Sequence, residues 1–302
     1  MSVPRPRRVL VLLHARDREA TARPLLAWRL AECWRADGVE VVLQHGPQEV
    51  REAEVALNHV DLTITPSDYA ACLLRHALAL DAAVLDTSKR RLRKDLLGRE
   101  DRWAGPVIVA SDLDAGGEPE QRLLGQGMGA CRAALWGRLP GGRWREGRPL
   151  PARERSVLPG LHAVPRAVWA RRGLVVQRFM PEREGAHYAL RTHAVLGPRT
   201  LTRRVLGTHP VVQAAEQGWG EEVAAHPDVL AFTRALRLDH GEVDYVEHEG
   251  RAVVLDVSRT FPAASGLPPD RQREVAARLA PGLYDLWAAH LARQGVVPGV
   301  AR

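Results

Sequence analysis

The chain has 302 residues, with 43 lysines and arginines against 36 acidic residues and a formal net charge of +7. Hydrophobic residues make up 45% of the sequence and charged residues 26%, a globular balance that excludes a wholly disordered chain. The length suits one large domain or two modest ones. No apolar run approaches the ~20 residues of a membrane span, and residues 9–13 are too short for the apolar region of a secretory signal.

Composition also bears on compartment and partners. The three cysteines, Cys33, Cys72 and Cys131, lack the spacing of a disulfide framework or a zinc site, so we expect a cytoplasmic protein. All basic residues except Lys89 and Lys94 are arginines, and they are spread along the chain among acidic residues. A basic stripe with interleaved aromatic residues is typical of nucleic-acid binding, which is therefore the least favoured class of function.

The first part of the chain alternates between helices and strands, as parallel α/β sheets do. We predict strands at residues 9–13, 39–43, 54–57, 62–65 and 83–85, and helices at residues 23–36 and 67–80. Asp37 and Gly38 end the first helix, because glycine readily adopts the left-handed conformation of a helix C-terminus. These elements predict a small open parallel-sheet α/β domain over residues 1–87.

Residues 88–302 change in character and become α+β in the C-terminal half. We predict helices at residues 88–97, 120–136, 164–170, 227–236 and 269–291, the last interrupted at Pro281 and Gly282. Strands are expected at residues 106–110 and 174–179, and hairpins at residues 187–206 and 242–257. A Gly-rich loop follows the first of these strands at residues 111–117, and residues 140–151 are predicted to form a surface loop that closes over a ligand.

The second hairpin carries the chemistry. Asp244 lies on its first strand, Asp256 on its second, and Ser258 follows two residues later on the same strand face. Two carboxylates and a hydroxyl on paired strands suit Mg²⁺, a hard cation that prefers oxygen ligands and often also holds phosphates. The alternative is that both carboxylates point to solvent. Because each interrupts an apolar run and an unpaired buried carboxylate is costly, the metal site is favoured.

The order of these segments resembles the ATP-grasp superfamily, whose members mostly join a carboxylate to an amine or thiol through an acyl phosphate. The resemblance covers residues 88–291. Its matching parts are the basic helix at residues 88–94, residues 106–117, the strand 175–182, residues 187–191, Arg203 with Arg204, and Asp244 with residues 255–260. Residues 112–120 and 179–191 are similar to a group of small bacterial ATP-grasp proteins of unassigned activity. The resemblance implies an ATP-grasp domain of two subdomains over residues 88–302, with a hinge near residues 177–182.

The resemblance also implies roles for residues. It assigns nucleotide binding to Lys89, Lys94, Gln177, Arg178, Phe179, Met180, Glu182, Glu184 and His187. It assigns neutralisation of phosphate, or contact with the acceptor, to Arg191, Arg203, Arg204 and Arg259, and Mg²⁺ binding to Asp244, Asp256 and Ser258. For each arginine the alternative is an ordinary solvated strand face.

Two departures from the family pattern leave two functions open. Ala110 stands where the family usually places a lysine that contacts the nucleotide phosphates, and Ser258 replaces an asparagine ligand. Arg99, Arg102 and Arg178 are candidates to replace the missing cation. One reading is an ATP- and Mg²⁺-dependent ligase that joins small-molecule or peptide carboxylates to amines. The other is a degenerate relative that binds a ligand or partner without turnover. Neither reading fixes the substrate or a homo-oligomeric state.

Overall fold

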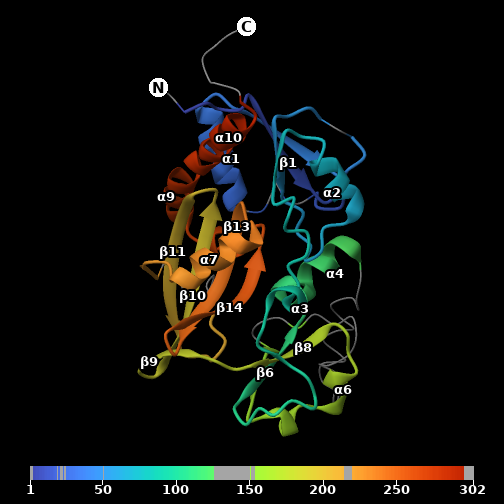
Figure 1. Ribbon diagram of the computed structural model, residues 1–302, viewed down its shortest axis with the longest axis vertical. Coiled ribbons are helices and arrows are strands. Elements are labelled where there is room, and N and C mark those ends of the chain that lie inside the picture. Colours follow the sequence, from blue (N-terminus) through green and yellow to red (C-terminus); the bar gives the residue numbers. More distant parts are fainter. Residues whose placement is uncertain are drawn as a thin grey trace.

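The computed structural model describes residues 3–18, 20, 23, 25–49, 51–125, 150, 154–213 and 220–295. Figure 1 shows three sheets, with the N-terminal sheet and a small sheet at opposite ends of the molecule and a large sheet between them. This arrangement is a mixed α/β fold with one parallel and two antiparallel sheets, as expected from the sequence. No helix among these described residues is both long and apolar enough to cross a membrane.

The N-terminal sheet is parallel and has the strand order β2-β1-β3-β4. Its elements are β1 (Arg8–Leu13), α1 (Leu26–Ala36), β2 (Glu40–His45), β3 (Val55–Asn58), α2 (Ser67–Leu73) and β4 (Leu78–Leu80). The predicted strands at 62–65 and 83–85 are wrong, since the first contains only an isolated bridge between Ile64 and Asp86. The predicted helix 67–80 stops at Leu73, because the following residues pair with β3 instead.

The small sheet is antiparallel, in the order β5-β8-β6-β7. Around it the chain forms α3 (Lys89–Leu92), β5 (Leu96–Leu97), β6 (Val107–Ser111), η2 (Asp114–Gly117), α4 (Glu118–Leu124), β7 (Val157–Leu158), η5 (Leu161–Ala163), α6 (Arg166–Trp169) and β8 (Leu174–Arg178). The predicted basic helix 88–97 is confirmed only for its first turn, because β5 pairs with β8. The predicted loop 140–151 and the helix beyond residue 125 lie outside the described residues, apart from Leu150.

The large sheet is antiparallel, in the order β12-β11-β10-β13-β14, with β9 also paired to β10. Its elements and the helices that follow are β9 (Glu182–Glu184), β10 (His187–Leu196), β11 (Arg199–Gly207), β12 (Glu221–Glu222), α7 (Pro227–Leu236), β13 (His240–His248), β14 (Arg251–Ser258), α8 (Pro262–Ser265), α9 (Pro269–Leu279) and α10 (Pro281–Arg293). Both predicted hairpins and the break between the last two helices are confirmed.

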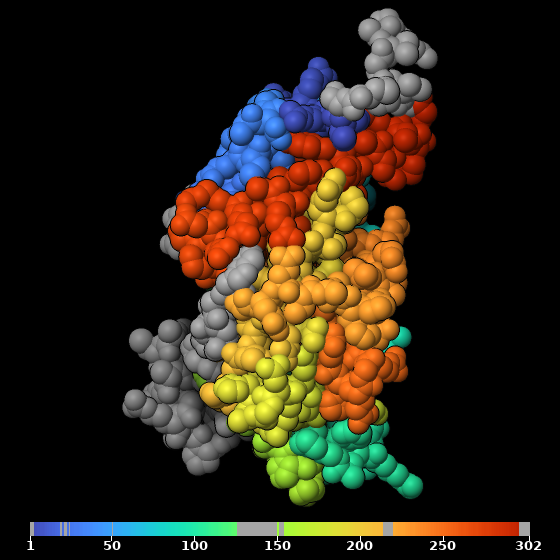
Figure 2. All heavy atoms as spheres, turned by 90° about the vertical axis from the view of Figure 1, so that its left-hand side faces the viewer, coloured from blue at the N-terminus to red at the C-terminus, as the bar shows by residue number. Residues whose placement is uncertain are grey.

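The main hydrophobic core joins the two ends of the chain. It combines α1 and the N-terminal sheet with α9, α10 and β10. The indole of Trp34 donates to the Ala280 carbonyl at 3.0 Å. Figure 2 shows α9 and α10, in red, directly against the blue N-terminal segments. Gly282 is required here, because a Cβ atom at this position would lie 1.9 Å from the Leu196 carbonyl oxygen.

Candidate functional site

A cavity of about 290 Å³ lies between the small sheet and the large sheet. Its lining from the small sheet and the segment that follows β8 includes Ile108, Gln177, Arg178, Phe179, Met180 and Glu182. Its lining from the large sheet includes Leu190, Glu242, Asp244, Val246, Asp256 and Ser258. The cavity therefore places an apolar wall and an oxygen-rich wall opposite one another.

The oxygen-rich wall is built by the register of one hairpin. Asp244 on β13 stands directly opposite Asp256 on β14, and Glu242 stands directly opposite Ser258. Residues opposite each other, and residues two apart along a strand, share one face of a sheet. The four side chains therefore form a compact group on the cavity side. The convergence of Asp244, Asp256 and Ser258 follows the prediction, whereas Glu242 was missed although the same alternation points to it.

Two hydrogen bonds orient the paired aspartates. The Thr192 hydroxyl on β10 donates to Asp244 Oδ1 at 2.8 Å. The Lys89 ammonium donates to Asp256 Oδ2 at 2.9 Å and to the Leu113 carbonyl at 3.1 Å. Lys89 is only 2% exposed, and the Asp256 carboxylate is the acidic group that pairs with it. The structure thus places Lys89, expected to contact the nucleotide, against a predicted metal ligand.

The carboxyl groups around the cavity are crowded and poorly compensated. Burial, reinforced by the neighbouring Asp256, raises the pKa of Asp244 to about 6, although the Thr192 hydrogen bond opposes this effect. Burial and Asp244 likewise raise the pKa of Glu242 to about 7, against two hydrogen bonds from the α8 main chain. Burial and Asp256 raise the pKa of Asp114 to about 8. Several carboxyl groups thus share a setting that disfavours their ionised forms.

The donor set fits Mg²⁺. Mg²⁺ in phosphate-transfer sites is usually held by one or two carboxylates, with water and phosphate completing its coordination. Asp244 and Asp256 supply the carboxylates and Ser258 supplies a hydroxyl, which also contacts Thr260 Oγ1 at 3.1 Å. Among the described residues no three histidine, cysteine or carboxylate side chains form a preformed metal cluster. Mg²⁺ would also favour the ionised forms of these carboxyl groups, which burial and the neighbouring carboxyl groups disfavour.

The apolar wall and hinge suit a flat heteroaromatic ring. Gln177 is 4% exposed, lines the cavity, and has no partner for its Nε2 among the residues that the structure describes. In the predicted adenine-binding segment, Arg178 N donates to Asp95 O and Phe179 N to Pro106 O. The Arg178 guanidinium stacks on Trp103 at 4.8 Å. A buried donor without a partner is costly, so Gln177 is available to an acceptor on a ligand.

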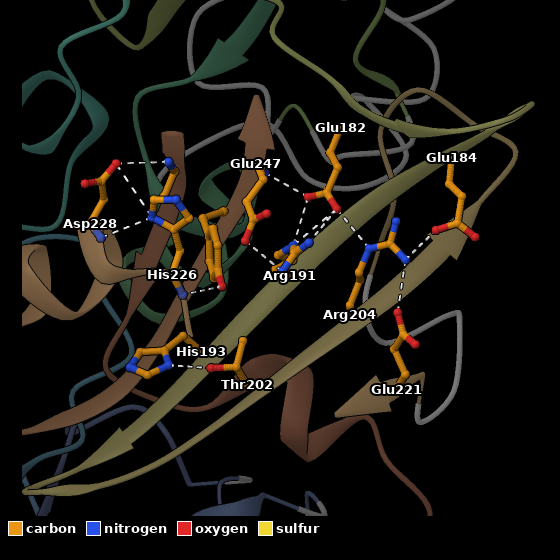
Figure 3. Close-up of polar contacts among 12 residues, drawn as sticks. Glu182, Glu184, Arg191, His193, Thr202, Arg204, Glu221, His226, Asp228 and Glu247 are labelled. Carbon is orange, nitrogen blue, oxygen red and sulfur yellow. Dashed lines mark hydrogen bonds and ion pairs between the residues drawn. The ribbon is translucent and has the colours of Figure 1, made fainter. Parts of the chain in front are cut away.

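Glu182 at the start of β9 is the centre of an ion-pair network (Figure 3). It accepts hydrogen bonds from Arg191 Nε at 3.0 Å, from Arg204 Nε at 2.9 Å and from the Glu247 main chain at 2.8 Å. Burial opposes ionisation of Glu182, but these hydrogen bonds keep its pKa below the ordinary value. Arg204 also pairs with Glu184 and Glu221. The two arginines are thus held by carboxylates at the edge of the cavity.

Strand alternation separates the four predicted arginines. Arg203 stands opposite Thr192, which stands opposite Asp244, so Arg203 shares their sheet face. Arg191 and Arg204, which pair with each other across β10 and β11, belong to the opposite face. Arg259 is 3% exposed and donates to the main-chain carbonyls of Val84 and Leu62. None of these four side chains lines the cavity.

The residues predicted to bind the nucleotide fall into two groups, those that line the cavity and those that do not. Gln177, Phe179, Met180 and Glu182 line the cavity, as does Arg178. Lys94, Glu184 and His187 are exposed and do not line it. Arg99 and Arg102, considered as replacements for the missing lysine, are also exposed and away from the lining.

A second cavity of about 240 Å³ adjoins the first toward the N-terminal sheet. Asp114, Ala115, Ser258 and Pro262 line both cavities. In the second cavity the Asp17 carboxylate is bound by Arg23 at 2.7 Å and Arg122 at 2.9 Å. His59 also lines it, is 2% exposed, and has no partner for either ring nitrogen among the described residues. No local pattern in the sequence indicates this cavity, because its lining comes from distant segments.

The chain was also compared with known proteins. No model of a known protein family and no curated protein sequence matches it. Solved structures do resemble it along most of its length. A RimK-domain ATP-grasp protein from Sphaerobacter thermophilus shares 17% identity, with 91% of this chain and 98% of that chain covered and a TM-score of 0.48.

Two further solved structures are similar at lower scores. The macrocyclase MdnB from Microcystis aeruginosa shares 14% identity, with 93% and 99% of the two chains covered and a TM-score of 0.44. D-alanine–D-alanine ligase from Bacillus anthracis, complexed with ATP, shares 12% identity, with 95% and 97% covered and a TM-score of 0.40. These values describe a similar chain trace and assign no role to any residue.

Proposed function

We propose that the chain is an ATP-grasp ligase that binds MgATP in the first cavity and activates a carboxylate for transfer to an amine. The observation that carries the proposal is the opposition of two walls in one cavity. One wall presents Asp244, Asp256 and Ser258. The other presents apolar side chains and the Gln177 Nε2, which has no hydrogen-bond partner within the described part of the chain. A nucleotide has the same two halves, an aromatic base and a metal-bound phosphate chain.

The residues divide the work of the proposed reaction. Gln177 and the hinge segment hold the base, while Asp244, Asp256 and Ser258 would hold Mg²⁺, which supplies charge neutralisation to the phosphates. Arg203 shares the sheet face of Asp244, and its positive charge partly compensates the carboxyl groups there. Glu182 lines the cavity and holds Arg191 and Arg204, which lie on the sheet face opposite to that of Asp244, so its role is to order this edge of the cavity.

The second cavity is the proposed site of the carboxylate and amine substrates. It meets the first cavity at Asp114 and Ser258, so a carboxylate held there can approach the terminal phosphate. The carboxylate oxygen attacks the terminal phosphorus and ADP leaves. The amine then attacks the acyl carbon, phosphate leaves, and the amine loses a proton to solvent. The chemistry of the site does not distinguish small-molecule from peptide substrates.

A second candidate is supported by the ion pair at the metal ligand. The Lys89 ammonium forms an ion pair with Asp256 at 2.9 Å, and the Ala110 side chain carries no charge that could bind phosphate. Both features suit a degenerate ATP-grasp protein that binds a ligand or partner protein without turnover. The two candidates differ in whether ADP is released.

The test is a calorimetric and thermal-shift titration with MgATP. We expect the melting temperature to rise with MgATP by mass action, and the rise to disappear in Asp256→Asn. Asp270→Asn, which changes an exposed carboxylate on α9, is the matched control and should respond like the unmodified chain. No binding at millimolar MgATP would refute the proposal. Binding without ADP release from a panel of carboxylates and amines would favour the non-catalytic candidate.

A further inference from the structure

The first cavity lacks a strand lysine, but it contains an arginine from the neighbouring strand. Arg155 lies two residues before β7 and lines the cavity. β7 pairs with β6 through Val157 opposite Ile108 and Leu158 opposite Val107. Arg155 precedes this paired segment by two residues, and continuing the register past its end directs Arg155 toward Ala110. Residues opposite each other in antiparallel strands have Cβ atoms about 4.5–5.5 Å apart on one face of the sheet.

The face in question is the one that borders the cavity. Ile108 lines the cavity and alternates with Val107 and Val109, which belong to the hydrophobic core on the other side. Ala110 therefore faces the cavity side, two residues beyond Ile108. The opposite position supplies a long cationic side chain to this same face. A cation absent from β6 is thus present in the segment that leads into β7.

The other cations that line the cavity are already engaged. Arg93 is almost fully buried, with its guanidinium bound to Asp95 and to the Leu255 carbonyl. Arg178 stacks on Trp103. Arg155 differs, because its Nε is buried without a hydrogen-bond partner among the residues described. A buried donor of a charged group without a partner is costly unless a ligand satisfies it.

The charged groups near Arg155 are those at the end of the cavity where the phosphates of a nucleotide would bind. Burial lowers the pKa of Arg155, and the negative charges of Asp256, Asp114 and Asp244 oppose this effect. These are the carboxylates of the proposed metal site. An arginine beside them is near the place where metal-bound phosphate oxygens would lie, and a guanidinium binds phosphate oxygens through paired N–H groups.

We propose that Arg155 supplies, from the strand beside β6, the positive charge that contacts the phosphates of the bound nucleotide. This inference rests on the proposed function, because it requires a nucleotide in the first cavity. It makes Arg155 a catalytic residue that compensates for Ala110, a role that neither the sequence nor the compared structures assign.

The experiment measures dissociation constants of the full chain for MgATP and for adenosine. We expect Arg155→Ala to weaken MgATP binding about 10- to 100-fold, the range for a lost charge-assisted hydrogen bond, and to leave adenosine binding within about twofold. Arg155→Lys should retain part of the MgATP affinity. Arg166→Ala, an exposed arginine on α6, is the control and should bind both ligands normally.

The most discriminating experiment returns a positive charge to β6 in the Arg155 variant. Ala110→Lys added to Arg155→Ala should restore at least about tenfold of the lost MgATP affinity, because the charge returns to the same face from the facing position. A folded double variant with no restored affinity would overturn the equivalence of the two positions. If Arg155→Ala fails to fold, Arg155→Gln provides the same comparison with most of the side-chain volume retained.

The failures of the two proposals are distinguishable. If the unmodified chain does not bind MgATP, the proposed function fails. If it binds MgATP and Arg155→Ala or Arg155→Gln binds equally well, only the role of Arg155 is overturned. An equal loss of MgATP and adenosine affinity would show a structural role for Arg155 and would also overturn the inference.

Discussion

Asp244 and Asp256 stand directly opposite each other on β13 and β14, yet each depends on a different partner, Thr192 for the first and Lys89 for the second. A neutral hydroxyl orients one carboxylate and a buried ammonium balances the other. The pair is therefore asymmetric before any ligand binds. Substitution of Lys89 should therefore affect Asp256 and leave the hydrogen bond of Asp244 in place.

Lys89→Met should make the stability of the chain depend more strongly on Mg²⁺. The substitution leaves Asp256 without its 2.9 Å partner in a site where Lys89 was fully buried, and breaking a buried ion pair costs about 3–5 kcal/mol. Mg²⁺ at the same carboxylate should offset part of this loss. Urea unfolding with EDTA and with millimolar Mg²⁺ measures both effects. An equal response of the variant and the unmodified chain to Mg²⁺ would contradict this prediction.

Glu182→Gln should destabilise the chain more than Glu184→Gln. Glu182 is 8% exposed and compensates two arginines, so its neutral replacement leaves Arg191 and Arg204 poorly paired at about 2–4 kcal/mol. Glu184 is 60% exposed and contacts only one of these arginines, which gives a loss below about 1 kcal/mol. Denaturant midpoints of the two variants make the comparison, and equal losses would argue against a central role for Glu182.

Arg259→Met should reduce stability without a selective loss of nucleotide affinity. The buried guanidinium donates to the carbonyls of Val84 and Leu62, which belong to the N-terminal part of the chain. Its removal leaves two carbonyls unpaired, at about 1–3 kcal/mol each. Thermal unfolding and a MgATP titration below the melting temperature separate the two effects. A stable variant with weakened MgATP binding would instead support the contact with ligand that the sequence suggested.

Acid should destabilise the chain through His59. Burial, helped by the nearby His240 and Arg23, lowers the pKa of His59 from 6.5 to about 3. The folded chain therefore keeps the imidazole neutral, while the unfolded chain takes up a proton below pH 6.5. The stability contributed by His59 is present above pH 6.5 and is lost as the pH falls from 6.5 toward 3, by up to about 1.4 kcal/mol per pH unit.

The measurement for this prediction is urea unfolding of the unmodified chain and of His59→Phe at several pH values. The variant has no group to protonate at this position, so its stability should fall less steeply between pH 6.5 and pH 5. Parallel curves for the two proteins would show that acid acts elsewhere. His290→Phe, which changes a half-buried histidine on α10, is a control for the loss of an imidazole.

The parts of the site that the sequence predicted are those that depend on local geometry. A hairpin fixes its own register, so alternation along residues 242–258 was enough to bring Asp244, Asp256 and Ser258 to one face. The same rule, applied fully, identifies Glu242. It also shows that the adjacent residues Arg203 and Arg204 face opposite sides of the sheet and cannot act at one point.

The parts that the sequence could not predict depend on distant segments. The contact of Lys89 with Asp256 joins residues 167 positions apart, and nothing near either residue indicates the other. The capture of Arg191 and Arg204 by Glu182 depends on β9 folding back onto β10. In the N-terminal part, residues 78–80 have apolar spacing compatible with a helix, and only pairing with β3 makes them a strand. Arg155 is placed by the pairing of β7 with β6.

The shared core of α1, α9 and α10 has a consequence for synthesis of the chain on the ribosome. The N-terminal sheet and α1 are made first, but Trp34 and the neighbouring apolar side chains are covered only by residues 269–293. Until those residues emerge, one apolar face of the earliest segment stays exposed. Complete burial of the N-terminal segment therefore waits for α9 and α10, and nascent chains truncated before α9 should bind chaperones and be cleaved readily by proteases, although the strands that line both cavities are already present.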